Sequence, residues 1–137
     1  MRRWFIGLTL LAAVGCRVPP DREDLKLFDE KRAPLGYADL YLRARSQSNL
    51  ALEAFYTDNW LDLDEAAKGL EQTARFLPKA LDTPADIRIA EQLRADAARL
   101  GEAARAKDVR VANEVLQRIQ FNIRTLRPAM KETPAKE

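Results

Sequence analysis

Two stretches of the chain carry apolar residues at alternating steps of three and four, and this spacing constrains the fold more than any other feature. The apolar positions of the first stretch are Trp60, Leu63, Ala67, Leu70, Ala74 and Leu77. Those of the second are Val109, Ala112, Leu116, Ile119, Ile123 and Leu126. Such steps place side chains on one face of an α-helix, whereas a half-buried strand alternates at every second residue. The spacing therefore predicts two amphipathic helices.

Two further helices complete the predicted fold. The third in chain order has the inward positions Ala90, Leu93, Ala97, Leu100 and Ala104. The first runs from about Leu35 to Tyr56, with Tyr37, Tyr41, Ala44, Ala51 and Phe55 inward. Four helices joined by short turns predict an all-α protein, an antiparallel up-down four-helix bundle over residues 35–128. The alternative is a three-helix domain with the first helix at its periphery.

Local signals mark where these helices begin and end. Asp58 or Asp62 is expected to cap the second helix, and Pro78 to stop it or kink its last turn. Thr83, followed by a proline, is expected to cap the third helix. Asp108 is expected to cap the fourth, which should end at Pro128.

The first residues have the pattern of a bacterial lipoprotein signal peptide. Arg2 and Arg3 precede an apolar run over residues 4–14, which is shorter than the roughly 20 residues of a membrane span. The run ends in small residues and Cys16, and this sequence, AVGC, resembles the lipobox of bacterial lipoproteins. The resemblance implies that residues 1–15 are removed and that Cys16 is lipidated. The alternatives are a plain cleaved signal peptide, a twin-arginine signal and a retained membrane anchor.

This prediction gives the protein an address. Two or three acyl chains on Cys16 would anchor it stably, because each buried methylene adds about 0.8 kcal/mol of membrane affinity. The resemblance places the protein in the bacterial cell envelope, facing the periplasm. Arg17, where an aspartate would favour inner-membrane retention, points to the outer membrane if the cell has one.

Residues 16–34 are expected to form a charged, proline-containing tether, and residues 129–137 a polar C-terminal tail. A fully disordered tether is at odds with its apolar residues Leu25, Leu27 and Phe28. These side chains are expected either to dock on the bundle or to form a short helical turn.

Composition excludes several classes of function. Without Arg2 and Arg3 the 23 basic side chains become 21, equal to the 21 acidic ones, so no electrostatic footprint for nucleic acid remains. The chain has no histidine and a single cysteine, which excludes a Cys/His metal site and an internal disulfide. No motif joins a nucleophile to a base, so no enzymatic activity, catalytic residue or cofactor is predicted.

The stretches "YTDNWLDLDEAAKGL" and "AKDVRVANEVLQRI" resemble the soluble b-type and c-prime cytochromes, which are small four-helix bundles. The resemblance implies the same fold. The haem ligands of those families are replaced here: Arg127 stands at the histidine position and about Ala44 at the methionine position. Ile123 and Leu126 stand at the positions of the thioether cysteines, so the resemblance implies a relative without haem.

A candidate groove lies on the first helix, where the polar run "RARSQSN" interrupts the apolar face. Tyr41, Ser48 and Ala97 are its expected lining, although a buried Ser48 bonded to its own backbone is the plainer interpretation. We expect a lipid-anchored, non-enzymatic binding or structural accessory protein whose partners are the membrane and another envelope protein. The alternative is a small-molecule carrier or sensor that uses the bundle core.

Overall fold

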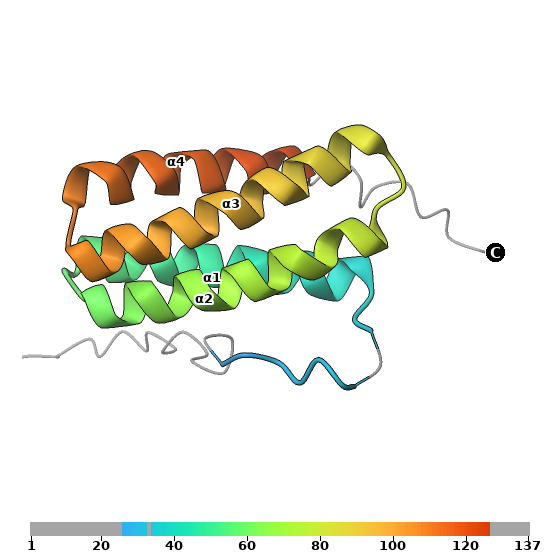
Figure 1. Ribbon diagram of the computed structural model, residues 1–137, viewed down its shortest axis with the longest axis horizontal. Helices are drawn as coiled ribbons and strands as arrows, with labels where there is room; N and C mark the ends of the chain where they lie inside the picture. Colours follow the sequence, from blue (N-terminus) through green and yellow to red (C-terminus); the bar gives the residue numbers. More distant parts are fainter. Residues whose placement is uncertain (1–25, 33, 127–137) are drawn as a thin grey trace, which may run out of the picture.

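Four α-helices joined by short turns make up the fold. The computed structural model describes residues 26–32 and 34–126, and no β-strand occurs among them. Successive helices run in opposite directions, so the predicted antiparallel four-helix bundle is confirmed (Figure 1). The elements are α1 (Tyr37–Tyr56), α2 (Trp60–Phe76), a short 3₁₀ helix η2 (Leu77–Ala80), α3 (Pro84–Ala106) and α4 (Val109–Leu126).

Each helix packs against its neighbours in the chain, and α1 closes the bundle against α4. The contact between α2 and α3 is the most extensive, and that between α1 and α4 is the least extensive of the four. The alternative of a three-helix domain is wrong, because α1 buries Leu40, Ala44 and Ala51 in the common core.

The core follows the predicted apolar faces closely. Every predicted inward residue of α3 is buried, and so are those of α2 from Leu63 onward. One expectation is wrong at α4, where Val109 is 56% exposed because it begins the helix at the end of the bundle. In α1 the buried face is wider than predicted and also takes in Leu40 and Gln47.

The N-terminal ends of α3 and α4 are capped as predicted. The Thr83 hydroxyl accepts from the backbone N–H of Asp86 at 3.3 Å, and Pro84 opens α3, where no hydrogen-bond donor is needed. The Asp108 carboxylate accepts from the backbone N–H of Val111 at 3.0 Å.

The cap of α2 differs from the prediction, which named Asp58 or Asp62. Asn59 is the capping residue, and its side-chain oxygen accepts from the backbone N–H of Asp62 at 3.2 Å. Asp58 is unavailable for capping because it lies in the turn, with a left-handed φ of 53°. At the other end, α2 gives way to η2 around Pro78, whose missing N–H interrupts the helical hydrogen bonds.

Leu70→Ala tests the assignment of the core. Leu70 is fully buried on α2, so its truncation should lower the free energy of unfolding by about 2–5 kcal/mol. Leu61→Ala is the matched control, since Leu61 lies on the same helix and is 69% exposed; its effect should stay within about 0.5 kcal/mol. Urea denaturation followed by circular dichroism measures both. Equal losses in the two variants would contradict the assignment.

Candidate functional site

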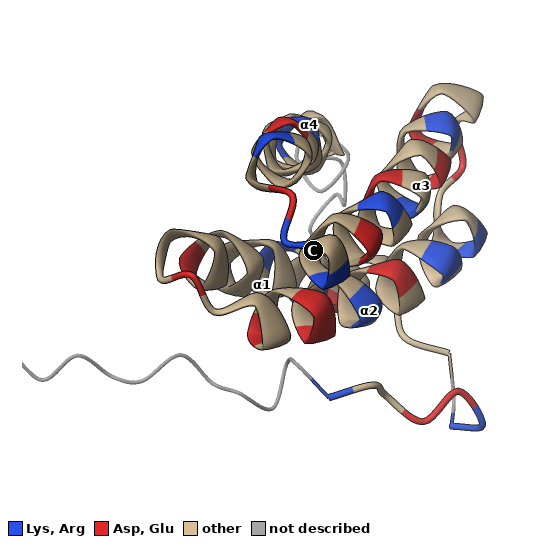
Figure 2. Cartoon of the chain, turned by 60° about the vertical axis from the view of Figure 1, so that its left-hand side comes forward, with Lys and Arg blue, Asp and Glu red and all other residues tan. Residues whose placement is uncertain are grey.

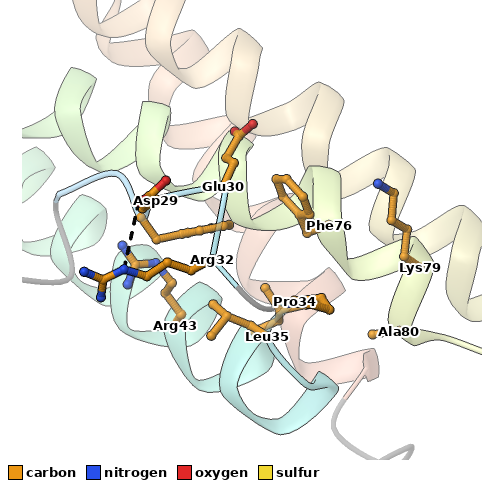
Figure 3. A pocket seen from close by; sticks show the side chains of 11 residues that line it. Asp29, Glu30, Arg32, Pro34, Leu35, Arg43, Phe76, Lys79 and Ala80 are labelled. Atoms are coloured by element: carbon orange, nitrogen blue, oxygen red, sulfur yellow. Dashed lines mark ion pairs between the residues drawn. The ribbon is translucent and has the colours of Figure 1, made fainter.

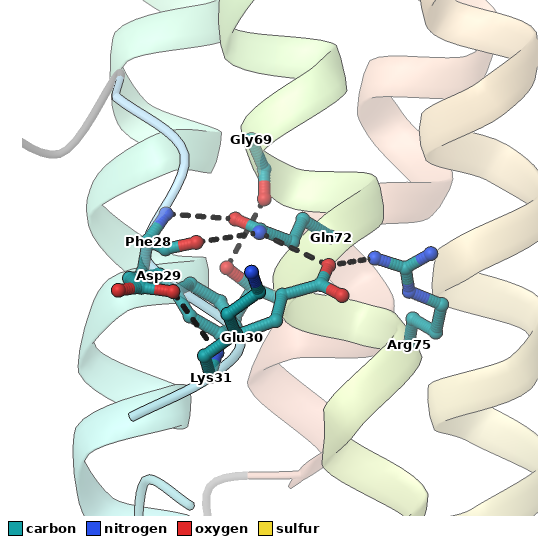
Figure 4. A network of polar contacts seen from close by, with 8 residues as sticks. Phe28, Asp29, Glu30, Lys31, Gly69, Gln72 and Arg75 are labelled. Carbon is teal, nitrogen blue, oxygen red and sulfur yellow. Dashed lines mark hydrogen bonds and ion pairs between the residues drawn. The ribbon is translucent and has the colours of Figure 1, made fainter. Parts of the chain in front are cut away.

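Residues 26–32 and 34–36, which precede α1, are docked on the bundle, and we call them the N-terminal strap. The strap runs along α1 and α2 in the direction opposite to α1 and then turns into that helix (Figure 1). Phe28 is its main attachment point: its backbone N–H donates to Gln72 Oε1 at 3.0 Å, and Gln72 Nε2 donates back to the Phe28 carbonyl at 2.9 Å. The side-chain amide of Gln72 thus pairs with the strap backbone as a neighbouring strand would (Figure 4).

Side chains add to this attachment. The Phe28 ring packs edge-on against Phe76, with ring centroids 5.3 Å apart. The guanidinium of Arg43, on α1, lies 5.2 Å from the centroid of the Phe28 ring. Glu30 forms an ion pair with Arg75 and accepts a hydrogen bond from Gln72 at 3.2 Å. Such aromatic and cation–π contacts contribute about 0.5–1.5 kcal/mol each. The described part of the predicted tether is therefore an ordered part of the domain.

The sequence analysis predicted the apolar residues of this attachment site but not its polar contacts. Leu27 and Phe28 raised the alternative of docking; Phe28 docks, whereas Leu27 is exposed, and Leu25 lies outside the described residues. Gln72 stands outside the predicted apolar face of α2, and nothing in its local pattern marks it as a partner for a residue 44 positions away.

The strap encloses a pocket of about 460 Å³ against the first turns of α1 and the end of α2. Its apolar walls come from four elements, with Phe28 and Leu35 on the strap, Leu40 on α1, Phe76 at the end of α2 and Ala80 in η2. Figure 3 shows Leu35, Phe76 and Ala80 around it. The charged side chains of Arg43 and Lys79 face it from opposite sides (Figure 3). Arg43 Nε is buried and has no hydrogen-bond partner among the described residues.

The groove predicted from the sequence is only partly assembled. Tyr41 and Ser48 line a second pocket of about 240 Å³ between α1 and α4, where Gln120 Nε2 donates a hydrogen bond to the Ser48 hydroxyl. Ala97 does not line this pocket, because it is buried in the core on α3. Gln120 is the member that the sequence did not reveal.

Tyr37 also joins α1 to α4, at the start of α1. Its hydroxyl donates to the backbone carbonyl of Leu126 at 2.9 Å, which joins the start of α1 to the end of α4. Burial, with smaller contributions from the neighbouring Tyr41 and Asp86, raises the pKa of Tyr37 to about 12. The folded state therefore favours the neutral phenol.

Buried carboxylates serve the packing of helices. Asp64 on α2 pairs with Arg105 on α3 at 2.7 Å, and Asp96 on α3 pairs with Arg118 on α4 at 2.9 Å. The second contact raises the pKa of the Arg118 guanidinium. Figure 2 shows basic and acidic residues interspersed along the helices, a pattern typical of a solvated surface.

The positions that matter for the cytochrome resemblance are apolar parts of the core. Ala44, Ile123 and Leu126 are buried, and Arg127 lies outside the described residues. Within residues 26–32 and 34–126, no group of three or more cysteine or acidic side chains is placed to hold a metal ion. Cys16, the predicted site of lipidation, also lies outside the described residues.

No helix in the part of the chain that the structure describes combines the length and hydropathy of a membrane span. Comparison with protein-family models, with curated proteins and with solved structures finds no match to this chain. Three features of the structure bear on function: the strap, the pocket beneath it and the groove between α1 and α4.

Gln72→Met tests the docking of the strap. The variant keeps the length of the side chain but removes both hydrogen bonds to Phe28, so the strap should open more often while the bundle stays folded. Limited trypsin cleavage at Lys31 and Arg32 should become several-fold faster, with little change in the melting temperature. Gln117→Met is the control, because Gln117 is exposed on α4. Cleavage at the rate of the unsubstituted chain would contradict the docked strap.

Tyr37 gives a pH dependence with a defined sign. Since its pKa in the folded state lies above the ordinary value of 10.0, its contribution to stability is complete below pH 10 and is lost as the pH rises towards 12. Tyr37→Phe should lower the free energy of unfolding by about 1 kcal/mol at neutral pH and weaken its decline between pH 10 and 12. Urea denaturation across this range measures it. Tyr56→Phe, at a residue that is 74% exposed, should leave the decline unchanged.

Proposed function

We propose that this chain is a non-enzymatic, lipid-anchored protein of the bacterial cell envelope that binds another envelope protein. The support from the sequence is the signal-like segment that ends in Cys16. The main support from the structure is the docked strap. Lys26, the first described residue after Cys16, accepts a hydrogen bond from Arg43 and so lies against the side of the bundle.

The docked strap restricts where the bundle lies relative to the proposed anchor. Residues 17–25 separate Cys16 from the strap, and a chain of that length spans at most about 30 Å. The strap is attached to α1 and α2, so these two helices would lie on the membrane side. The opposite side, formed by α3 and α4, would then face the periplasm.

A surface suited to a protein partner lies on that opposite side. Phe121 on α4 is 64% exposed and lies in a shallow depression with Gln92 on α3 and Arg118 on α4. An exposed aromatic ring with arginine beside it is the composition typical of residues that dominate protein interfaces. We therefore assign the proposed contact with an envelope partner to the face around Phe121.

A small-molecule carrier is the second candidate function, favoured by the pocket of about 240 Å³ beside Tyr41 and Ser48. This pocket opens between α1 and α4, the helices with the least extensive contact of the bundle. A ligand there would meet Tyr41, Ser48 and Gln120, and Ala97 would take no part.

Labelling of cells with radioactive palmitate tests the proposed anchor. The unsubstituted chain should incorporate label and sediment with membranes, and Cys16→Ser should lose both properties, because the thiol is the attachment point for lipid. Cys16→Ser should keep the circular dichroism of a folded bundle, since the described core lies wholly within residues 37–126. Equal labelling of the two chains would overturn the anchor.

The partner surface is tested in the same cells with a photo-crosslinking amino acid in place of Phe121. An adduct with one envelope protein is expected at this position and not at Asn113, an exposed residue of the same helix. Absence of any adduct at Phe121, in a chain that remains a monomer in the envelope, would overturn the proposed interaction.

A further inference from the structure

The pocket beneath the strap has the dimensions and walls of a site for a small ligand. Its volume of about 460 Å³ falls within the roughly 300–1,000 Å³ of ligand pockets in proteins. Phe28, Leu40 and Phe76 give it an apolar lining from three separate elements. Leu40 is itself part of the hydrophobic core, so this lining is continuous with the packed interior. A ligand with an apolar body would be desolvated there.

Two cations at the pocket form no ion pair within the part of the chain that the structure describes. Arg43 donates to the backbone carbonyl of Lys26, yet its Nε is buried without an acceptor among the described residues. Lys79 lies 5.2 Å from the ring centroid of Phe76, and no carboxylate of the described chain forms an ion pair with it. A buried donor without an acceptor is unfavourable, and an incoming acceptor would remove that cost.

The acidic residues of the pocket are already engaged. Glu30 is held by Arg75 and by the amide of Gln72. Asp29 accepts from the backbone N–H of Lys31 at 3.0 Å and lies 3.9 Å from Arg32. Neither carboxylate forms an ion pair with Arg43 or Lys79 in the described structure, and the pocket lining carries more basic than acidic side chains.

We propose that this pocket binds a small amphipathic carboxylate, such as a medium-chain fatty acid. Its alkyl chain would lie against Phe28, Leu40 and Phe76, and its carboxylate would be attracted by the positive charges of Arg43 and Lys79 at the rim. A planar carboxylate matches the hydrogen-bonding geometry of a guanidinium, and its single charge is cheaper to desolvate than that of a phosphate. The site is separate from the Phe121 face and does not depend on lipidation of Cys16.

Photoaffinity labelling with a diazirine analogue of decanoate tests the site on the full chain in isolated envelopes. Mass spectrometry should locate the label in the peptides that contain Leu35–Arg43 and Phe76–Ala80, and unlabelled decanoate should compete for it. The corresponding decanol analogue should label these peptides about tenfold less, since it lacks the charge for Arg43 and Lys79. Equal labelling by the alcohol would show plain hydrophobic partitioning and overturn the proposal.

Lys79→Met is the main variant, because Lys79 lies over the ring of Phe76 and forms no hydrogen bond or ion pair with the described residues of the strap. It should raise the concentration for half-maximal labelling about tenfold, while trypsin still cleaves Lys31 at the original rate. Arg94→Met, which removes an exposed cation from α3, is the matched control and should change neither value.

Ala80→Phe fills the pocket without changing charge and should abolish labelling there. Cys16→Ser should be labelled at the same peptides as the unsubstituted chain, so a failure of the proposed anchor remains distinct from a failure of this site. Labelling that survives both Lys79→Met and Ala80→Phe would overturn the proposal.

Discussion

The close approach of α2 and α3 is the contact on which the rest of the structure depends. Small residues face each other along it; a Cβ atom on Gly101 would lie 3.7 Å from the Cβ of Ala67 and 3.4 Å from a carboxylate oxygen of Asp64. Large side chains would hold the two axes apart, whereas alanine and glycine allow interdigitation at native density. The ion pair between Asp64 and Arg105 adds a polar contact at the same level. This pair of helices has the most extensive contact of the bundle.

Elsewhere in the bundle, polar contacts join α1 to α4 and hold the strap. The hydroxyl of Tyr37 and the pair of Gln120 with Ser48 join α1 to α4, and the amide of Gln72 holds the strap. A partly exposed hydrogen bond contributes only about 1 kcal/mol, so these connections open before the core does. Both pockets lie at these seams, where a ligand can enter without disruption of the α2–α3 contact.

The strap is common to the proposed membrane anchor and the proposed carboxylate site. It begins at residue 26, the first that the structure describes after the proposed anchor, and it supplies Phe28 to the wall of the proposed carboxylate pocket. A ligand that contacts both the strap and the helices stabilises the docked form by its differential affinity for that form. Occupancy of the pocket would in this way fix the side of the bundle that faces the membrane, and with it the direction of Phe121.

The sequence by itself determined the helices, their apolar faces and most of their caps. The faces of α2 and α3 and the caps Thr83 and Asp108 follow from the residues within one or two turns, where the helical repeat and side-chain chemistry act locally. At α2 the cap is Asn59, one residue after the predicted Asp58. Both residue types are good caps, and only the left-handed turn at Asp58 selects between them.

Only the tertiary structure decided where function can reside. It paired Gln72 with a backbone 44 residues away, brought Gln120 to Ser48 across 72 residues, and removed Ala97 from the predicted groove. It also turned a predicted tether into one wall of a pocket. Such contacts depend on the rotation of each helix about its axis and on the path of the strap. These are set by the packing of the whole bundle, and no local pattern in the sequence encodes them.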